Sequence, residues 1–209
     1  ADVSDFMTIK DIIDRLRKKY SRINGIIHSA GIAGEGFLIR KDEAVFSEVL
    51  LPKIYGTWIL DTVTKDDRLD FFVMCSSMAS IFSSAGQGDY VGANAYMDSF
   101  AAYRNRTGRR SLCIDWVTWK ETGMGVRFGI NIDTLFKAIT TNKALEGFER
   151  VIGSEISRIL IGEMNYSSDQ LQLIENIPLD LSESIMNKVK RSIENQKAIS
   201  AKVNHKKGY

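Results

Sequence analysis

Side chains that could act on a carbonyl group are concentrated around Ser77, Tyr90 and Asn94. Ser76 and Ser77 follow a short apolar run, while Tyr90 and Asn94 lie one helical turn apart and so share a helix face. A serine can donate a hydrogen bond to a carbonyl oxygen, and a tyrosine can deliver a proton to it if a nearby cation lowers its pKa. Lys53 is the candidate cation. This combination of residue types predicts carbonyl chemistry.

The elements that must position these groups read as strand, loop and helix over Phe71–Arg106. Phe71–Met74 is apolar, as in a buried parallel strand, and Asp89 is a suitable N-cap for the helix that holds Tyr90. Open α/β sheets bind ligands beyond the carboxyl ends of their strands, where the serines lie. Further strands are predicted near residues 24–29, 111–116 and 156–161, and helices at Met7–Tyr20, Lys41–Thr64 and Ala144–Ile152. This alternation predicts an α/β fold with a Rossmann-like, doubly wound parallel sheet.

Several motifs, in order and at family-like spacing, resemble the ketoreductase domain of modular type I polyketide synthases, a branch of the short-chain dehydrogenase/reductase superfamily. The resemblance runs from Ala1 to about Asn165. The stretches that carry it are GIIHSAG (Gly25–Gly31), LPKIYGTWIL (Leu51–Leu60), FFVMCSSMAS, GDYVGANAYMDSFA, IDWVTWKETGM (Ile114–Met124), TTNKALEGFERVI (Thr140–Ile152) and RILIGEMN (Arg158–Asn165).

This resemblance implies NADPH-dependent reduction of a β-ketoacyl thioester, carried on an acyl carrier protein, to the β-hydroxyacyl form. The reaction would belong to a multifunctional enzyme of polyketide and antibiotic biosynthesis. By the same resemblance Tyr90 is the proton donor, and Ser77 rather than Ser76 polarises the substrate carbonyl. Lys53 and Asn94 complete the tetrad by lowering the pKa of the tyrosine and relaying protons. The Tyr-x-x-x-Asn pattern differs from the Tyr-x-x-x-Lys of ordinary short-chain dehydrogenases.

The resemblance also implies positions for the cofactor and for the substrate with its lid. Asp2 would lie near the cofactor adenine, although its surroundings in the sequence also fit a solvated or capping aspartate. The irregular stretch Val117–Asn142 is expected to form the lid. The cofactor positions are Asp2, Val3, Ser29, Ala30 and Gly31, and the substrate or lid positions are Glu35, Phe82, Gln87, Trp119 and Met124.

Two of these positions bear on the stereochemistry that the resemblance implies. Family members that make one alcohol epimer carry Leu-Asp-Asp where this chain has Ala33-Gly34-Glu35, and Glu35 keeps one acidic group there. Members that make the other epimer often carry a tryptophan where this chain has Phe82. The residues favour the first class without meeting either pattern in full.

The domain organisation is interpreted from the same resemblance. Residues 1–165 are taken as an N-terminally incomplete catalytic part and residues 166–209 as a C-terminal linker, partly helical or disordered. The family has three earlier strands, which carry the glycine-rich phosphate loop. One edge of the strand at 24–29 should therefore lack a partner, and we expect the missing N-terminal half or a self-associating copy to cover it.

The composition of the chain argues against several other classes of protein function. A net charge of +2 gives no indication of nucleic-acid binding, and no apolar run reaches transmembrane length. Cys75 and Cys113 are isolated thiols, which favours a reducing, cytoplasmic setting. With only His28 and His205 as histidines, we expect no metal site and a packed, structural His28.

Two alternatives to the enzymatic interpretation stay open. The chain could be an inactive structural fragment of a synthase ketoreductase, and we expect the fragment alone to be inactive. It could also be a short-chain dehydrogenase acting on a free, small carbonyl substrate. The intact tetrad argues against decay of the parent domain, and the Tyr-x-x-x-Asn pattern with the long tail argues against the free enzyme.

Overall fold

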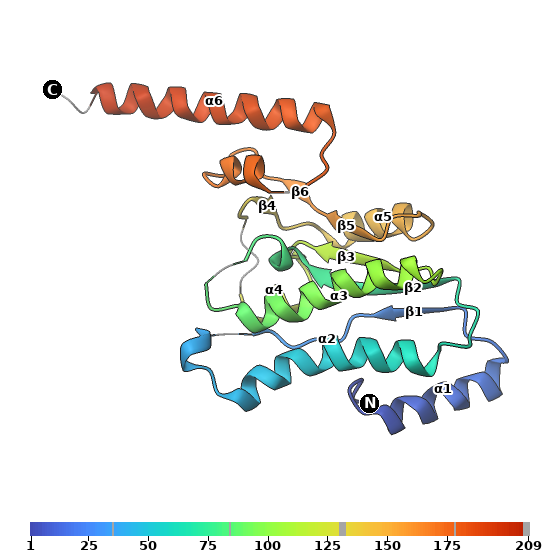
Figure 1. Ribbon diagram of the computed structural model, residues 1–209. Coiled ribbons are helices and arrows are strands. Elements are labelled where there is room, and N and C mark those ends of the chain that lie inside the picture. Colours follow the sequence, from blue (N-terminus) through green and yellow to red (C-terminus); the bar gives the residue numbers. More distant parts are fainter. Residues whose placement is uncertain (35, 84, 130–132, 178, 207–209) are drawn as a thin grey trace. The chain divides into compact units, whose positions relative to one another are not determined.

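A computed structural model describes residues 1–34, 36–83, 85–129, 133–177 and 179–206 of the chain (Figure 1). Its contacts divide the chain into two compact units. The first unit comprises residues 1–117 and 140–161, and the second comprises residues 118–139 and 162–209. The boundary near residue 165 between catalytic part and linker stays a prediction.

A four-stranded parallel sheet forms the centre of the first unit, with the strand order β1-β2-β3-β5. Its register places Ile27 opposite Val73 and Cys75 opposite Ile114. Each of the four strands lies where the apolar runs predicted one, and the predicted α/β class with a parallel sheet is confirmed. Among the described strands β1 lies at one edge of the sheet. The strands are β1 (Gly25–His28), β2 (Phe71–Ser77), β3 (Leu112–Trp116) and β5 (Arg158–Ile161).

Helices connect these strands, as parallel strands require. Asp5 caps α1 by accepting hydrogen bonds from the backbone N–H groups of Met7 and Thr8. Asp42 caps α2 in the same way, and Pro52 is accommodated inside that helix. The four longer helices of the unit are α1 (Phe6–Tyr20), α2 (Glu43–Val63), α3 (Gly88–Arg106) and α5 (Thr141–Val151), with short 3₁₀ turns η1 (Leu38–Arg40) and η2 (Met78–Ser80).

Alternate side chains of β2 divide the core between the two faces of the sheet, as the period of a strand dictates. Phe72 and Met74 are fully buried against Met97 and Ala101 of α3. Val73 points to the opposite face, where Val151 of α5 contributes to a second cluster. The helix that carries the predicted tyrosine is therefore fixed on the sheet by its own apolar residues.

The second unit is built from short pieces and one long helix. Its strands pair antiparallel, with Phe136 opposite Met164. Val189 and Ile193 of α6 are buried, as are Leu171 and Ile174 of η3. Residues Glu183–Lys206 of the tail form the helix α6, and the role of the tail as a linker stays a prediction. The elements are α4 (Met124–Arg127), β4 (Phe136–Lys137), β6 (Glu163–Met164), η3 (Leu171–Asn176) and α6 (Glu183–Lys206). Among the described residues, no helix has both the length and the apolarity needed to span a membrane.

One local prediction was wrong. Asp89 does not cap α3; the helix begins at Gly88 after Gln87, whose side chain makes no capping hydrogen bond. Asp89 instead lies in the first helical turn and is fully buried. The helix begins earlier than predicted, so the Asp89 carboxylate accepts from the N–H of Tyr90 from within the first turn and pairs with Lys41.

Candidate active site

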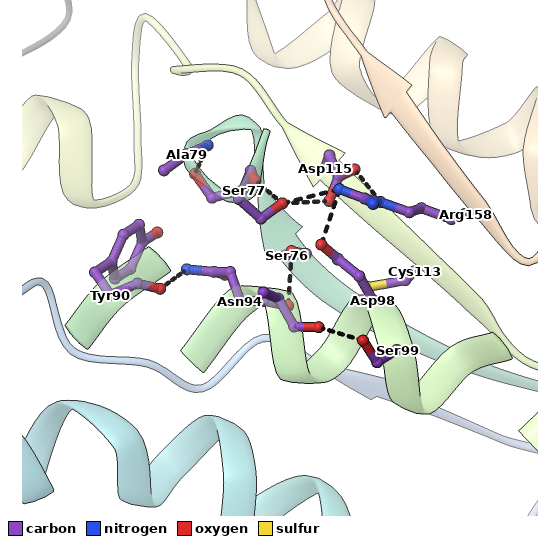
Figure 2. A network of polar contacts seen from close by, with 12 residues as sticks. Ser76, Ser77, Ala79, Tyr90, Asn94, Asp98, Ser99, Cys113, Asp115 and Arg158 are labelled. Atoms are coloured by element: carbon purple, nitrogen blue, oxygen red, sulfur yellow. Dashed lines mark hydrogen bonds and ion pairs between the residues drawn. The ribbon is translucent and has the colours of Figure 1, made fainter. Parts of the chain in front are cut away.

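The predicted tetrad comes from three elements of the first unit. Ser77 is the last residue of β2, Lys53 lies on α2, and Tyr90 and Asn94 lie one turn apart on α3. Figure 2 shows Tyr90 and Asn94 on the helix that faces the end of β2, where Ser76 and Ser77 lie. The carboxyl ends of parallel strands are where α/β sheets bind ligands. The structure therefore brings the predicted residues together at a position suited to a site.

Lys53 is a buried cation with an unusual set of partners. The residue is 2% exposed, and Nζ donates to the carbonyl oxygen of Cys75 at 2.8 Å. The sulfur of Met97 lies 3.6 Å from Nζ, and the ring centroid of Tyr90 lies 6.0 Å from it. Burial lowers the pKa of Lys53 because a desolvated ammonium is disfavoured. Among the residues described, no carboxylate forms an ion pair with it.

Tyr90 departs from the prediction in one respect. Burial raises the pKa of its phenol above the ordinary value, and the side chains of Ser77 and Asn94 act in the opposite direction. The lowering that we predicted from Lys53 is not the dominant influence here. A half-buried phenol favours the neutral form. In this structure Tyr90 is thus a neutral donor at neutral pH, which is the form that can deliver a proton.

Asn94 and the two serines have distinct local roles. Asn94 is fully buried; its Nδ2 donates to the carbonyl oxygen of Tyr90 at 2.7 Å, while no described donor reaches its Oδ1. Ser76 is buried, and its Oγ lies 3.4 Å from the carbonyl oxygen of Asn94. Ser77 is half-buried, and its Oγ accepts from the N–H of Ala79 at 3.2 Å. Its side chain also hydrogen-bonds Tyr90, an interaction that acts to lower the pKa of that phenol. The choice of Ser77 over Ser76 as the donor to substrate stays a prediction.

Three of the predicted cofactor positions follow the carboxyl end of β1. Ser29 is exposed, and Ala30 and Gly31 are half-buried. A Cβ added at Gly31 would lie 2.9 Å from Cε of Lys53. The missing side chain of Gly31 is what lets this segment pass directly over the buried lysine.

The other two predicted cofactor positions lie at the start of the chain. Asp2 is exposed, and its Oδ1 accepts from the backbone N–H of Ser4 at 2.9 Å and from its hydroxyl at 2.6 Å. These hydrogen bonds lower the pKa of Asp2. Val3 packs against the apolar cluster of Ile9 and Ile59, and a Cβ at Gly56 would clash with it at 2.7 Å. Asp2 thus closes a local turn with Ser4, while Asp5 caps α1. A cofactor role for Asp2 or Val3 stays a prediction.

The predicted substrate and lid positions are distributed over both units. Gln87 and Phe82 are half-buried in the segment between β2 and α3, near Tyr90 in the sequence. Glu35 lies outside the described residues. Trp119 and Met124 belong to the second unit, where Trp119 forms a bridge with Ile139 and Met124 begins α4. Their roles toward substrate stay predictions.

His28 is packed, as the sequence predicted. It is 2% exposed, and its Nε2 lies 3.1 Å from the carbonyl oxygen of Pro52. Burial, followed by the charge of Lys53, lowers its pKa to about 4. The imidazole is therefore neutral at physiological pH and helps to hold α2 beside β1.

A buried charged cluster behind Asn94 was not predicted. Asp98 and Asp115 both pair with Arg158, through Nη2 at 2.9 Å and Nε at 2.7 Å, and the Cys113 thiol donates to Asp98 at 3.2 Å (Figure 2). Burial, and then the neighbouring Asp98, raise the pKa of Asp115. Asp98, Cys113 and Asp115 have the donor types of a metal site. Arg158 supplies one positive charge against two carboxylates, and the raised pKa of Asp115 reflects that imbalance. We interpret the cluster as a structural charge network.

Sequence reasoning also missed a second buried lysine. The ion pair between Lys41 and Asp89 has side chains that are 2% and 0% exposed. No local signal distinguishes Lys41 from an ordinary lysine before a helix. The glycine at position 34 is related to this ion pair, because a Cβ there would lie 2.3 Å from Oδ1 of Asp89.

Comparison with known proteins adds an independent line of evidence. The family model described as the KR domain matches residues 1–121. Polyketide synthase PksN of Bacillus subtilis (strain 168) is 40% identical over 131 residues, which is 60% of this chain and 2% of that protein. Polyketide synthase ThaG of Burkholderia thailandensis is 36% identical over 129 residues, 59% of this chain and 2% of that protein. The chain thus spans a very small part of these curated relatives.

Solved structures agree in fold. An N-terminal ketoreductase from the macrolactin assembly line superposes with a TM-score of 0.71 at 31% identity, covering 85% of this chain and 35% of that chain. A ketoreductase domain from the bacillaene assembly line gives 0.71 at 32% identity, with 79% and 42% covered. An A1-type ketoreductase reaches 0.80 at 22% identity, with 92% and 41% covered, and this likeness concerns the fold alone.

Proposed function

Because this chain belongs to the KR domain family, we propose that it is the catalytic part of a polyketide synthase ketoreductase. The proposed reaction reduces a β-ketoacyl thioester on an acyl carrier protein to the β-hydroxyacyl form, with NADPH as the reductant. The proposed setting is the cytoplasm, which suits two free thiols.

One observation carries the proposal. A buried lysine without a carboxylate partner among the described residues lies 6.0 Å from the ring of Tyr90, at the carboxyl ends of the strands. Burying an ammonium in this way is costly, and the hydrogen-bond partners of Lys53 Nζ within the described part of the chain are a carbonyl oxygen and a sulfur. Such an arrangement is typical of a functional site rather than of a stabilising contact.

The residues of the chain divide the work of carbonyl reduction among them. Ser77 donates a hydrogen bond to the carbonyl oxygen, which favours the negative charge that develops there. Tyr90 transfers its phenolic proton to that oxygen, and the positive charge of Lys53 stabilises the tyrosinate left behind. Asn94 holds the backbone of Tyr90 through Nδ2 and keeps Oδ1 as a buried acceptor for proton return. NADPH, when bound, supplies the hydride that the carbonyl carbon takes up.

The residues present fit one side of this cofactor. Ser29–Gly31 form an accessible segment that crosses Lys53 next to the tetrad, a position suited to the nicotinamide. The sequence contains no G-x-G-x-x-G run, so pyrophosphate contacts of that type are not part of this chain. We therefore propose that the chain alone is inactive.

The test replaces Tyr90 with phenylalanine. It is carried out in the complete ketoreductase domain, because the chain spans 35% and 42% of the solved ketoreductases described above. Tyr90→Phe removes the proton donor with little change in volume, so we expect turnover of a β-keto thioester to fall by about 10²–10⁴-fold. The unfolding transition should stay near that of the parent domain. Near-normal turnover in a folded variant would contradict the proposal.

A further inference from the structure

A buried ion pair that the tetrad does not use joins the segment after β1 to the first turn of α3. The ammonium of Lys41 contacts Oδ2 of Asp89, and the two side chains are 2% and 0% exposed. The other carboxylate oxygen, Oδ1, accepts from the backbone N–H of Tyr90 at 2.9 Å. One carboxylate therefore links a loop lysine to the backbone of the proposed proton donor.

The two chain segments meet closely at further points. A Cβ at Gly34 would lie 2.3 Å from Oδ1 of Asp89, and a Cβ at Gly88 would lie 2.7 Å from the side chain of Leu38. A Cβ at Gly86 would make ordinary contact with the backbone of Gly36, at 3.6 Å. We call this set of contacts, made by residues 34, 36, 38 and 41 with residues 86, 88 and 89, the loop clasp.

We propose that Lys41 and Asp89 are positioning residues, whose ion pair closes the loop clasp and fixes Tyr90 relative to Ser77 and Lys53. The inference rests on the proposed function of Tyr90. It goes beyond it by assigning a role in turnover to two residues that do not touch the reacting atoms.

Physical considerations favour a positioning role over a stabilising one. A buried ion pair adds little net stability, since desolvating both charges offsets their attraction, but it strongly penalises arrangements in which either charge is left alone. Asp89 also lies in the first turn of α3, where the helix dipole favours an anion. The pair thus defines one position for the loop and one for the start of the helix.

The experiment uses three variants and a matched control. Lys41→Met and Asp89→Asn each remove one charge, and the double variant removes both. Lys10→Met is the control, because Lys10 forms an ion pair with Asp14 that is exposed at 52% and 37%. Turnover is measured in the complete domain. The environment of Tyr90 is measured in the chain itself by NMR of ¹³Cζ-labelled tyrosine, with the Tyr90 signal among the seven tyrosines assigned by its loss in Tyr90→Phe.

The single variants should lower kcat by about 10–100-fold with little change in KM, because a small displacement of a reacting group costs rate rather than binding. The Tyr90 signal should move in the same variants and stay in place in Lys10→Met. In the double variant the unfolding midpoint should return toward that of the parent, since no charge is left buried alone. Its kcat and its Tyr90 signal should remain altered.

Recovery of kcat and of the Tyr90 signal together with stability in the double variant would overturn the proposal, as would single variants that leave both readouts unchanged. If the charge variants do not fold, Gly34→Ala tests the same idea with both charges kept. Its added Cβ must displace the Asp89 carboxylate, so kcat should fall and the Tyr90 signal should move. A parent-like Gly34→Ala would refute the role. The NMR readout does not depend on catalysis, so an active Tyr90→Phe would reject the proposed function while the loop clasp is still tested.

Discussion

Two lysines of the first unit, Lys53 and Lys41, both have buried ammonium groups, yet the partners of those groups differ. Lys41 forms an ion pair with the fully buried Asp89. Lys53 has a backbone carbonyl oxygen and a thioether, and its pKa is lowered by burial. A buried cation that is neutralised by a carboxylate can define a position, whereas one that is not neutralised can respond to charge that appears during a reaction.

Substitution of each lysine by methionine should separate these two roles in stability. Lys41→Met leaves the carboxylate of Asp89 buried without a partner, so we expect a loss of about 3–5 kcal/mol in the free energy of unfolding. Lys53→Met leaves no carboxylate behind and removes a desolvated charge, so stability at neutral pH should be unchanged or higher. Urea unfolding of the chain and its two variants measures both changes in the free energy of unfolding. Equal losses would show that the two sites do not differ as described.

Turnover should respond to Lys53 more than stability does. In the complete domain, Lys53→Met should lower kcat by about 100-fold, because the charge that favours tyrosinate is lost. The apparent pKa that governs activity should rise, since deprotonation of Tyr90 becomes harder without the neighbouring cation. pH–rate profiles of parent and variant decide this. If the pH–rate profile and kcat of Lys53→Met are the same as those of the parent, Lys53 has only a structural role.

A smaller effect is expected in the pH dependence of the free energy of unfolding, which also distinguishes Lys53 from Lys41. The pKa of Lys53 is lower in the folded chain than its ordinary value of 10.5 in an unfolded one. Between these two values the unfolded state binds more protons, so this group makes the parent chain more stable as pH rises. Lys53→Met lacks this titrating group, so its stability advantage over the parent should become smaller as pH rises from the folded-state pKa of Lys53 to 10.5. A difference that is constant up to pH 10.5 would contradict the buried, desolvated position.

The smallest expected signal is NADPH binding by the chain itself. The proposed nicotinamide contacts at Ser29–Gly31 would have to offset the entropy of fixing a large ligand without the backbone N–H groups of a G-x-G-x-x-G turn. Calorimetric titration should show no useful affinity. A sizing measurement should show association through the edge of β1, where Ile27 is 54% exposed. Tight binding by a monomer would mean that this account of the cofactor site is wrong.

Sequence reasoning located the strands because they depend on short-range signals, whereas the tetrad was proposed from the family resemblance and stays a prediction. Apolar runs marked β1, β2, β3 and β5, and helical spacing placed Tyr90 and Asn94 on one face. The two charged networks could not be predicted from the sequence because their members are far apart in the chain. Lys41 and Asp89 are separated by 48 positions, and Asp115 and Arg158 by 43. Each alone has an ordinary local explanation, as the mistaken N-cap at Asp89 illustrates.

Arg158 has a consequence for the order in which the first unit folds. Residues 1–117 enter this unit first, and the chain then passes through residues 118–139 before α5 and β5 rejoin it. Until β5 arrives, Asp98 and Asp115 lie close together with no guanidinium between them, and like charges repel. During synthesis at about 5–20 residues per second, 43 positions correspond to a delay of roughly 2–9 s. A chain that ends before residue 158 lacks this guanidinium, so we expect its Asp98 and Asp115 carboxylates to make the sheet less stable than in the whole unit.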